Sequence, residues 1–314
     1  MTSLDCSLLC ADACAYGIEP DATLLPPQPW YACVGFLEPP SIVESGTADI
    51  DAALVGTNAN GILVAFRGTL PPDNLTLPVL LDWLQSFSFA PAVSPLFAGT
   101  VHSGFLKGFQ SLWPGVQAAV DSLRKRYPAS PLFVTGHSKG GVLATLAAWQ
   151  FNKAGITPGA VVTFASPRPG DAAFAKAYTD LGIPHRRYEN YLDAVPFYPP
   201  DLDLLEPLRA LPGWSAQFES SADWDYQAVG ELRYIQQDGS VVGDSLGLAA
   251  ARVRQITENL LDGHASRVAD AHALVPPSPG TPKPAGAALV YSRGVCPDPL
   301  AGELDSTAQQ SGGR

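Results

Sequence analysis

The chain has 314 residues, of which 46% are hydrophobic and 16% are charged, so it is apolar enough to build a globular core. Its length suits one large α/β domain or two small ones. The formal net charge of −11 argues against nucleic acid as a partner and against anionic membranes bound by charge. No apolar run is long enough to span a bilayer, so no transmembrane segment is expected.

The first predicted element is an amphipathic helix over residues 4–16 that ends at Gly17. Cys6, Cys10 and Cys14 recur at every fourth residue, so we expect them on one helix face as small buried hydrophobes. A metal site would require C-x-x-C spacing or added histidines, so none is expected. The segment lacks the basic start and apolar core of a Sec-type signal, which leaves cytoplasmic residence and a non-Sec exit open.

The next apolar segment, residues 30–36, is expected to form an edge strand. It carries Cys33, which could pair with Cys296, although no pattern in the sequence requires this pair. With five cysteines in total, an odd number, a reducing compartment is the default expectation.

Residues 52–57 and 61–67 are expected to be two strands joined by an Asn-Ala-Asn-Gly turn. The second strand is uninterrupted apolar at 62–66, which predicts burial on both faces. A long connection with several prolines follows over residues 70–99, and it contains one short predicted helix at 78–85. Apolar residues occupy nearly the whole circumference of this helix, which is unusual for a surface helix and would also suit a buried core helix.

The stretch from Leu132 to Ala148 predicts a short apolar strand, a very tight turn at Ser138, and a helix rich in alanine and leucine. A G-x-S-x-G motif alone is weak evidence for a catalytic serine, but the predicted strand before it and helix after it strengthen that evidence. Glycines 136 and 140 are expected where a side chain would collide with the neighbouring strand or helix. The pattern therefore indicates a nucleophile elbow with an exposed serine at the N-terminus of a helix.

The remaining segments alternate between strands and helices, which indicates βαβ units, a mainly parallel sheet and an α/β fold. We expect a single domain over residues 1–300 and a disordered tail over 301–314. The predicted elements are a helix at 107–127, a strand at 159–165, a helix at 172–181, a strand at 185–191, a hairpin at 232–236 and 240–242, and a helix at 245–261.

A nucleophilic serine needs a histidine base, and that base needs an acid to fix its tautomer. His137 adjoins the serine and should point away from it. In the chain order serine, acid, histidine, only His264 and His272 qualify as the base. Asp193 follows a predicted strand at the edge where open α/β sheets build their sites, so it is the expected acid.

Acyl transfer also needs N–H donors for the developing oxyanion. The backbone of Lys139, directly after the serine, can supply one, and Thr69, after the strand at 61–67, is placed to supply the second. The Lys139 side chain is unusual because a cation at a helix N-terminus opposes the dipole. A salt bridge to a nearby carboxylate would account for it.

Together these residues resemble the class 3 lipases, the family that includes fungal triacylglycerol lipases and feruloyl esterases. The resemblance implies an α/β-hydrolase fold, Ser138 as nucleophile, Asp193 as acid, backbone donors at Thr69 and Lys139, and a lid at about 70–89. An apolar lid favours a lipase over a feruloyl esterase and implies transient contact with a lipid interface. The matching blocks are FRGT (66–69), DWL (82–84), VHSGF (101–105), GHSKGG (136–141), TFASPRPG (163–170) and DAVP (193–196).

The chain departs from the family pattern at Lys139 and in lacking a tyrosine soon after the C-terminal histidine. Ala271 to Leu274 and, after a proline-rich insert, Tyr291 to Cys296 look like a lengthened version of the ending of some bacterial members. We therefore prefer His272 to His264, whose place after Asp-Gly suits a helix C-cap. The expected activity is carboxylic ester hydrolysis of acylglycerols, without a metal or cofactor. Alternatives are a phospholipase, a phenolic or polyester esterase, or an inactive lipid-binding homologue.

Overall fold

The structure is a computed structural model that describes residues 3–19, 23–24, 29–45, 51–70, 90–199, 225–275 and 290–296. Within these ranges, no helix combines the length and hydropathy that crossing a membrane requires. The predicted lid beyond Leu70, its helix at 78–85, most of the proline-rich insert and the tail at 301–314 lie outside the described residues. The single domain over 1–300 stays a prediction.

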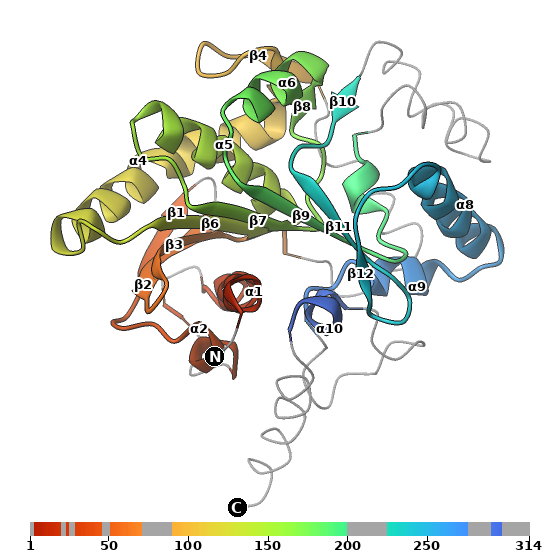
Figure 1. The fold of residues 1–314 in the computed structure, drawn as a ribbon, viewed down its shortest axis with the longest axis horizontal. Helices are drawn as coiled ribbons and strands as arrows, with labels where there is room; N and C mark the ends of the chain where they lie inside the picture. The colour runs from red at the N-terminus through yellow and green to blue at the C-terminus, as the bar shows by residue number, and fades with distance from the viewer. Residues whose placement is uncertain are drawn as a thin grey trace, which may run out of the picture.

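A twisted central sheet runs through the molecule (Figure 1), and among the described residues it contains eight strands. The five inner strands pair in parallel, and the outer strands at both edges pair antiparallel. This arrangement confirms the predicted α/β architecture. In spatial order the strands are β1 (Ser41–Ser45), β2 (Asp51–Asn58), β3 (Gly61–Phe66), β6 (Leu132–His137), β7 (Ala160–Phe164), β9 (His185–Asn190), β11 (Glu231–Ile235) and β12 (Val241–Val242).

Helices cover both faces of this sheet (Figure 1). Every residue of β3 is buried, as its apolar run predicts, and its side chains alternate between the two layers. Val64 belongs to the core on one face and Leu63 to the core on the other. The first layer contains α4 (Ser103–Arg126), α5 (Lys139–Lys153) and α6 (Ala172–Asp180), and the second contains α1 (Leu4–Ala15), α2 (Pro29–Val34) and α10 (Tyr291–Val295).

Smaller elements complete the described part of the chain. Four short strands form a second antiparallel sheet, which no sequence pattern indicated. Helices α8 and α9 lie beyond the β11–β12 edge of the large sheet (Figure 1) and lead to the loop that carries His272. The bounds of these smaller elements are β4 (Pro91–Val93), β5 (Thr100–His102), β8 (Gly170–Asp171), β10 (Tyr226–Gln227), the 3-10 helix η2 (Val195–Phe197), α8 (Leu248–Leu261) and α9 (Ala265–Asp270).

Two expectations for the N-terminal segment are wrong. Residues 30–36 do not form an edge strand, because Pro29–Val34 is the helix α2, joined to α1 by the Cys10–Cys33 disulfide. Helix α1 is not amphipathic, since every residue from Cys6 to Ala15 is buried. It lies between the sheet and α2 (Figure 1), so it has no solvent-facing side to carry polar residues.

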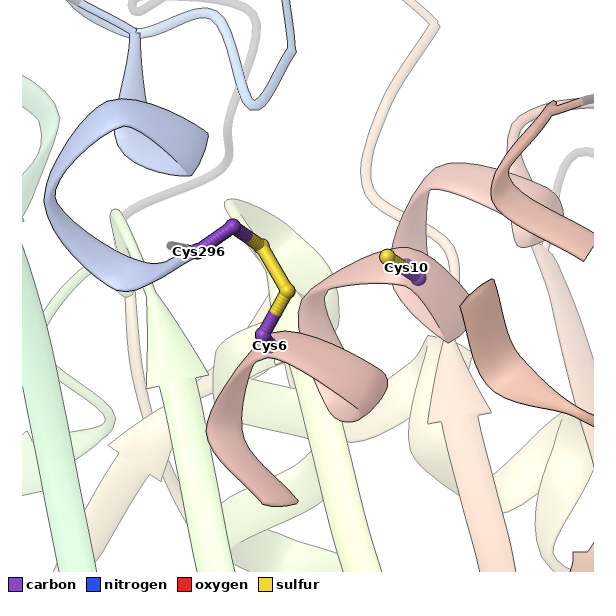
Figure 2. Close-up of side chains that lie close together, drawn as sticks. All are labelled: Cys6, Cys10 and Cys296. Atoms are coloured by element: carbon purple, nitrogen blue, oxygen red, sulfur yellow. A yellow bond between two sulfur atoms is a disulfide. The ribbon is translucent and has the colours of Figure 1, made fainter. Parts of the chain in front are cut away.

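The cysteine expectations are also corrected. Cys33 and Cys296 do not pair with each other, because Cys6 bonds Cys296 and Cys10 bonds Cys33. Figure 2 shows Cys6 of α1 joined to Cys296, with Cys10 one turn further along the helix. Only Cys14 fits the expected role of a small buried thiol. The helix spacing placed three cysteines together but held no information about their remote partners. Two disulfides favour an oxidising environment over the expected reducing compartment.

Candidate active site

Ser138 lies in a sharp turn between β6 and α5, as the predicted elbow requires. Its φ of 56° is in the left-handed region, which is strained for a residue with a side chain and costs about 1–3 kcal/mol. The two glycines explain how the turn closes. A Cβ on Gly136 would lie 2.0 Å from the Gly140 carbonyl oxygen, and one on Gly140 would lie 2.0 Å from the Phe66 carbonyl oxygen.

The structure brings Ser138, His272 and Asp193 together in one hydrogen-bonded chain. His272 Nε2 lies 3.0 Å from Ser138 Oγ, and His272 Nδ1 lies 3.1 Å from each carboxylate oxygen of Asp193. An ionised carboxylate only accepts hydrogen bonds, so Nδ1 carries the proton and Nε2 accepts from the serine hydroxyl. Asp193 is fully buried and follows β9, at the sheet edge predicted for the acid.

Two further groups hold the Asp193 carboxylate. The Tyr291 hydroxyl donates to Oδ2 over 2.6 Å, and the Val195 amide donates to Oδ1 over 3.0 Å. Tyr291 itself accepts from the Asn190 amide over 3.0 Å. Burial, reinforced by the adjacent Asp193, raises the pKa of Tyr291, so its hydroxyl stays protonated and donates. Sequence reasoning assigned no role to Tyr291, although its place in the lengthened C-terminal block could have pointed to one.

The other histidines have different surroundings. His264 is exposed and lies between α8 and α9, directly before the second helix rather than at the expected C-cap. His102 is fully buried and caps α4, with Nδ1 accepting from the Gly104 and Phe105 amides. Nδ1 of His185 meets the Tyr178 hydroxyl, and its Nε2 meets that of Thr163. Burial lowers the pKa of His102 and of His185 to about 3, so both are neutral.

The two expected oxyanion donors flank the elbow. A Cβ on Gly68 would lie 3.0 Å from Ser138 Cβ, so the loop carrying Thr69 packs directly against the serine. Within the described residues, the Thr69 hydroxyl oxygen is buried without a hydrogen-bond partner. Lys139 is the first residue of α5, where backbone N–H groups lack partners within the helix.

The Lys139 side chain forms the salt bridge that the sequence suggested. Its Nζ lies 2.5 Å from Asp51 Oδ1, and both side chains are largely buried. The ion pair neutralises the cation that would otherwise oppose the dipole of α5.

One group of side chains in the described ranges is close enough to share a metal ion, namely Cys6, Cys10 and Cys296. All three are bonded in disulfides, so they have no thiolate to offer a metal.

Comparison with known proteins identifies similar chains. Residues 63–202 match the family described as lipase (class 3). The lipase of Rhizomucor miehei is 34% identical over 150 residues, which cover 46% of this chain and 39% of that protein. A secreted mono- and diacylglycerol lipase of Fusarium solani is 32% identical over 171 residues, covering 50% of this chain and 49% of that protein. The chain thus spans less than half the length of these curated relatives.

Solved structures extend the similarity over more of the fold. A triacylglycerol lipase whose catalytic centre is formed by a serine protease triad is 25% identical with a TM-score of 0.57, over 74% of this chain and 79% of that one. The native propeptide complex of Rhizomucor miehei lipase is also 25% identical, with a TM-score of 0.55 over 76% and 69% of the two chains. The chain therefore has the α/β-hydrolase fold, and its residues 63–202 are similar to the class 3 lipases.

Proposed function

We propose that the protein is a serine carboxylic-ester hydrolase that acts on acylglycerol esters. The observation that carries this proposal is the continuous chain from Ser138 through His272 to Asp193. A serine, an imidazole and a buried carboxylate in this order are the groups that acyl transfer needs.

In the first half-reaction, Ser138 Oγ attacks the ester carbonyl carbon while His272 Nε2 takes the hydroxyl proton. Asp193 holds the imidazole by its Nδ1–H and stabilises the imidazolium that forms. The C–O bond to the alcohol then breaks, and His272 returns the proton to the leaving alcohol. Water repeats the sequence on the acyl-enzyme, again with His272 as base and then as acid, and releases the carboxylic acid.

The oxyanion of the tetrahedral intermediate is stabilised by the backbone N–H groups of Thr69 and Lys139. The buried Thr69 hydroxyl, which has no partner in the described part of the chain, is available as a third donor. Loss of one such donor typically costs about 100-fold or more in kcat. A Thr69→Val variant keeps the backbone amide and removes only the hydroxyl, so it measures this contribution separately.

The substrate class rests on similarity and on the predicted lid. The relatives from Rhizomucor miehei and Fusarium solani are called a lipase and a mono- and diacylglycerol lipase, which favours acylglycerols. An apolar lid at about 70–89 would contact the lipid interface transiently. A second candidate, phospholipid acyl hydrolysis, is favoured by 30% identity over 177 residues to phospholipase A1-II 4 of rice, 43% of whose length is covered.

The test compares the wild type with Ser138→Ala on p-nitrophenyl esters, emulsified triacylglycerol, phospholipid vesicles and a feruloyl ester. We expect hydrolysis by the wild type, highest on acylglycerol, and none by the variant. A fluorophosphonate probe should label the wild type at Ser138 only. Undiminished turnover by Ser138→Ala would refute the nucleophile, and an unlabelled, inactive wild type would refute the hydrolase and favour the inactive homologue.

A further inference from the structure

A second hydrogen-bonded chain runs behind the serine and uses none of the three side chains described above. It begins at Tyr16, the residue that ends α1. The Tyr16 hydroxyl lies 2.7 Å from His137 Nδ1, and His137 Nε2 lies 2.8 Å from the backbone carbonyl oxygen of His272. His137 is 5% exposed, and its ring centroid is 4.8 Å from that of His272.

The same hydroxyl also reaches the loop that carries Thr69. The Gly68 backbone lies directly against the Tyr16 oxygen. The approach is close enough that a Cβ on Gly68 would lie 2.2 Å from that oxygen. Tyr16 therefore connects two segments that are far apart in the sequence and adjacent in the site.

The chemistry of the end groups fixes the direction of every hydrogen bond in this chain. The His272 carbonyl can only accept, so His137 Nε2 carries a proton. His137 is neutral, because burial first and the neighbouring His272 second lower its pKa. Its Nδ1 is then an acceptor for the Tyr16 hydroxyl. Each ring nitrogen of His137 therefore has one partner that matches its donor or acceptor state.

We propose that Tyr16 and His137 are positioning residues that tie the loop carrying Thr69 to the backbone of His272. The proposal rests on the proposed function, because that function assigns the oxyanion donor and the base. The backbone of the His272 loop has a second anchor, since the Asn190 side chain donates to the Ala271 carbonyl over 2.9 Å. Because the Ala271 and His272 carbonyls are both held by hydrogen bonds, the His272 imidazole keeps its distance to Ser138 while positive charge develops on the imidazole.

A neutral His137 is also required on electrostatic grounds. His272 becomes an imidazolium when it takes the serine proton, and a second cation whose ring lies 4.8 Å away would oppose that step. The bond from Tyr16 keeps the Nδ1 of His137 occupied as an acceptor. The chain of hydrogen bonds from Tyr16 through His137 to the His272 carbonyl, here called the relay, thus fixes both the position of His272 and the charge of His137.

The first test is Tyr16→Phe, which removes only the hydroxyl, with Tyr178→Phe as a matched control. Tyr178 also meets a buried histidine Nδ1, that of His185 at 3.1 Å, outside the site. We expect Tyr16→Phe to lower kcat about tenfold with KM changed less than about twofold, because a misplaced base costs rate rather than binding. The control should keep its kcat. Equal kcat values in wild type and Tyr16→Phe, with Ser138→Ala inactive, would overturn the relay and leave the proposed function standing.

The second test separates the two bonds of His137. A glutamine amide reaches the depth of Nε2 and can donate to the His272 carbonyl, whereas an asparagine amide reaches only the depth of Nδ1 and can bond Tyr16. We expect kcat of His137→Gln to exceed that of His137→Asn by about fivefold or more. Equal kcat values would show that the bond to His272 does not position the base.

The third test needs no substrate, so it holds even if the proposed activity fails. Nitrogen NMR of the histidine rings should show His137 with a protonated Nε2 and a bare Nδ1 throughout pH 5–8. In Tyr16→Phe the preference between the two tautomers should weaken. The opposite tautomer in the wild type, or protonation of His137 in that range, would overturn the relay.

Discussion

The serine side and the histidine side of the site are held in place by contacts of different range. Ser138 lies in a turn that closes through Gly136 and Gly140, each within two residues of it. The loop of His272 is held by groups that come from remote parts of the chain, including His137 and Asn190. The proposed nucleophile is therefore positioned by local geometry and the proposed base by tertiary contacts. Changes far from Ser138 in the sequence should act mainly through the histidine side.

A side chain added in the turn around Ser138 should have the largest effect on the free energy of unfolding. In Gly140→Ala the new methyl group would overlap the Phe66 backbone oxygen, which cannot move without shifting β3. We expect the free energy of unfolding to fall by about 4 kcal/mol or more, measured by urea denaturation. Gly243→Ala is the control, because nothing lies within 4 Å of a Cβ at that position. Equal denaturation midpoints would mean that the turn tolerates a side chain.

The two disulfides test this difference directly, because only Cys6–Cys296 supports the loop that carries His272. Cys6–Cys296 anchors α10, whose Tyr291 bonds Asp193 and whose backbone pairs with residues 273–274. Replacing either pair of cysteines by serine should cost about 2–4 kcal/mol of unfolding free energy. Only loss of Cys6–Cys296 should also lower kcat of the folded protein for ester hydrolysis. Equal kcat values for that double variant and for Cys10→Ser with Cys33→Ser would contradict the anchoring role.

Removal of the Tyr291 hydroxyl tests whether its hydrogen bond supports Asp193, the proposed acid. Tyr291→Phe removes one of the hydrogen bonds that Asp193 Oδ2 accepts and the hydrogen bond that the Asn190 amide donates to Tyr291. We expect a loss of about 1–3 kcal/mol in unfolding free energy and a clear fall in kcat. Tyr188→Phe is the control, since its hydroxyl bonds Asp5 over 2.8 Å, outside the site. A fall in kcat of the same size in both variants would show that the effect is not specific to Asp193.

The smallest predicted effect concerns Asp12, which joins α1 to the strand leading to Ser138. Its carboxyl is fully buried against the Thr135 hydroxyl, and burial raises its pKa well above the ordinary value. The unfolded chain ionises near pH 4, so this group's contribution to stability is complete below about pH 4 and declines as pH rises toward the folded pKa. Asp12→Asn removes that titration.

We therefore expect Asp12→Asn to raise the free energy of unfolding at pH 8 by about 1 kcal/mol, with less effect at pH 4. Thermal denaturation of both proteins across this range measures the difference. Asp12→Asn should leave kcat unchanged, because the hydrogen bond to Thr135 supports a strand that is already fixed by its neighbours. A benefit that grows toward low pH would contradict the raised pKa.

Much of the fold follows from sequence patterns that act over short distances. The hairpin at 52–67, the elbow at Ser138 and the strand before Asp193 were each predicted with small errors in their bounds. Residues 30–36 were assigned wrongly because an apolar segment of that length suits a strand as well as a helix. The small second sheet was missed because its strands are only two or three residues long.

The tight turn follows from local sequence alone, since the glycines on either side of Ser138 and the apolar strand and small-residue helix around them act within one stretch of chain. Long-range packing, in contrast, brings His272 rather than His264 to Ser138, Tyr291 to Asp193, and Cys6 to Cys296. These contacts join segments about 100 to 290 residues apart, where spacing in the sequence carries no distance in space. They exist because the fold brings the ends of the sheet strands, α1 and α10 close together.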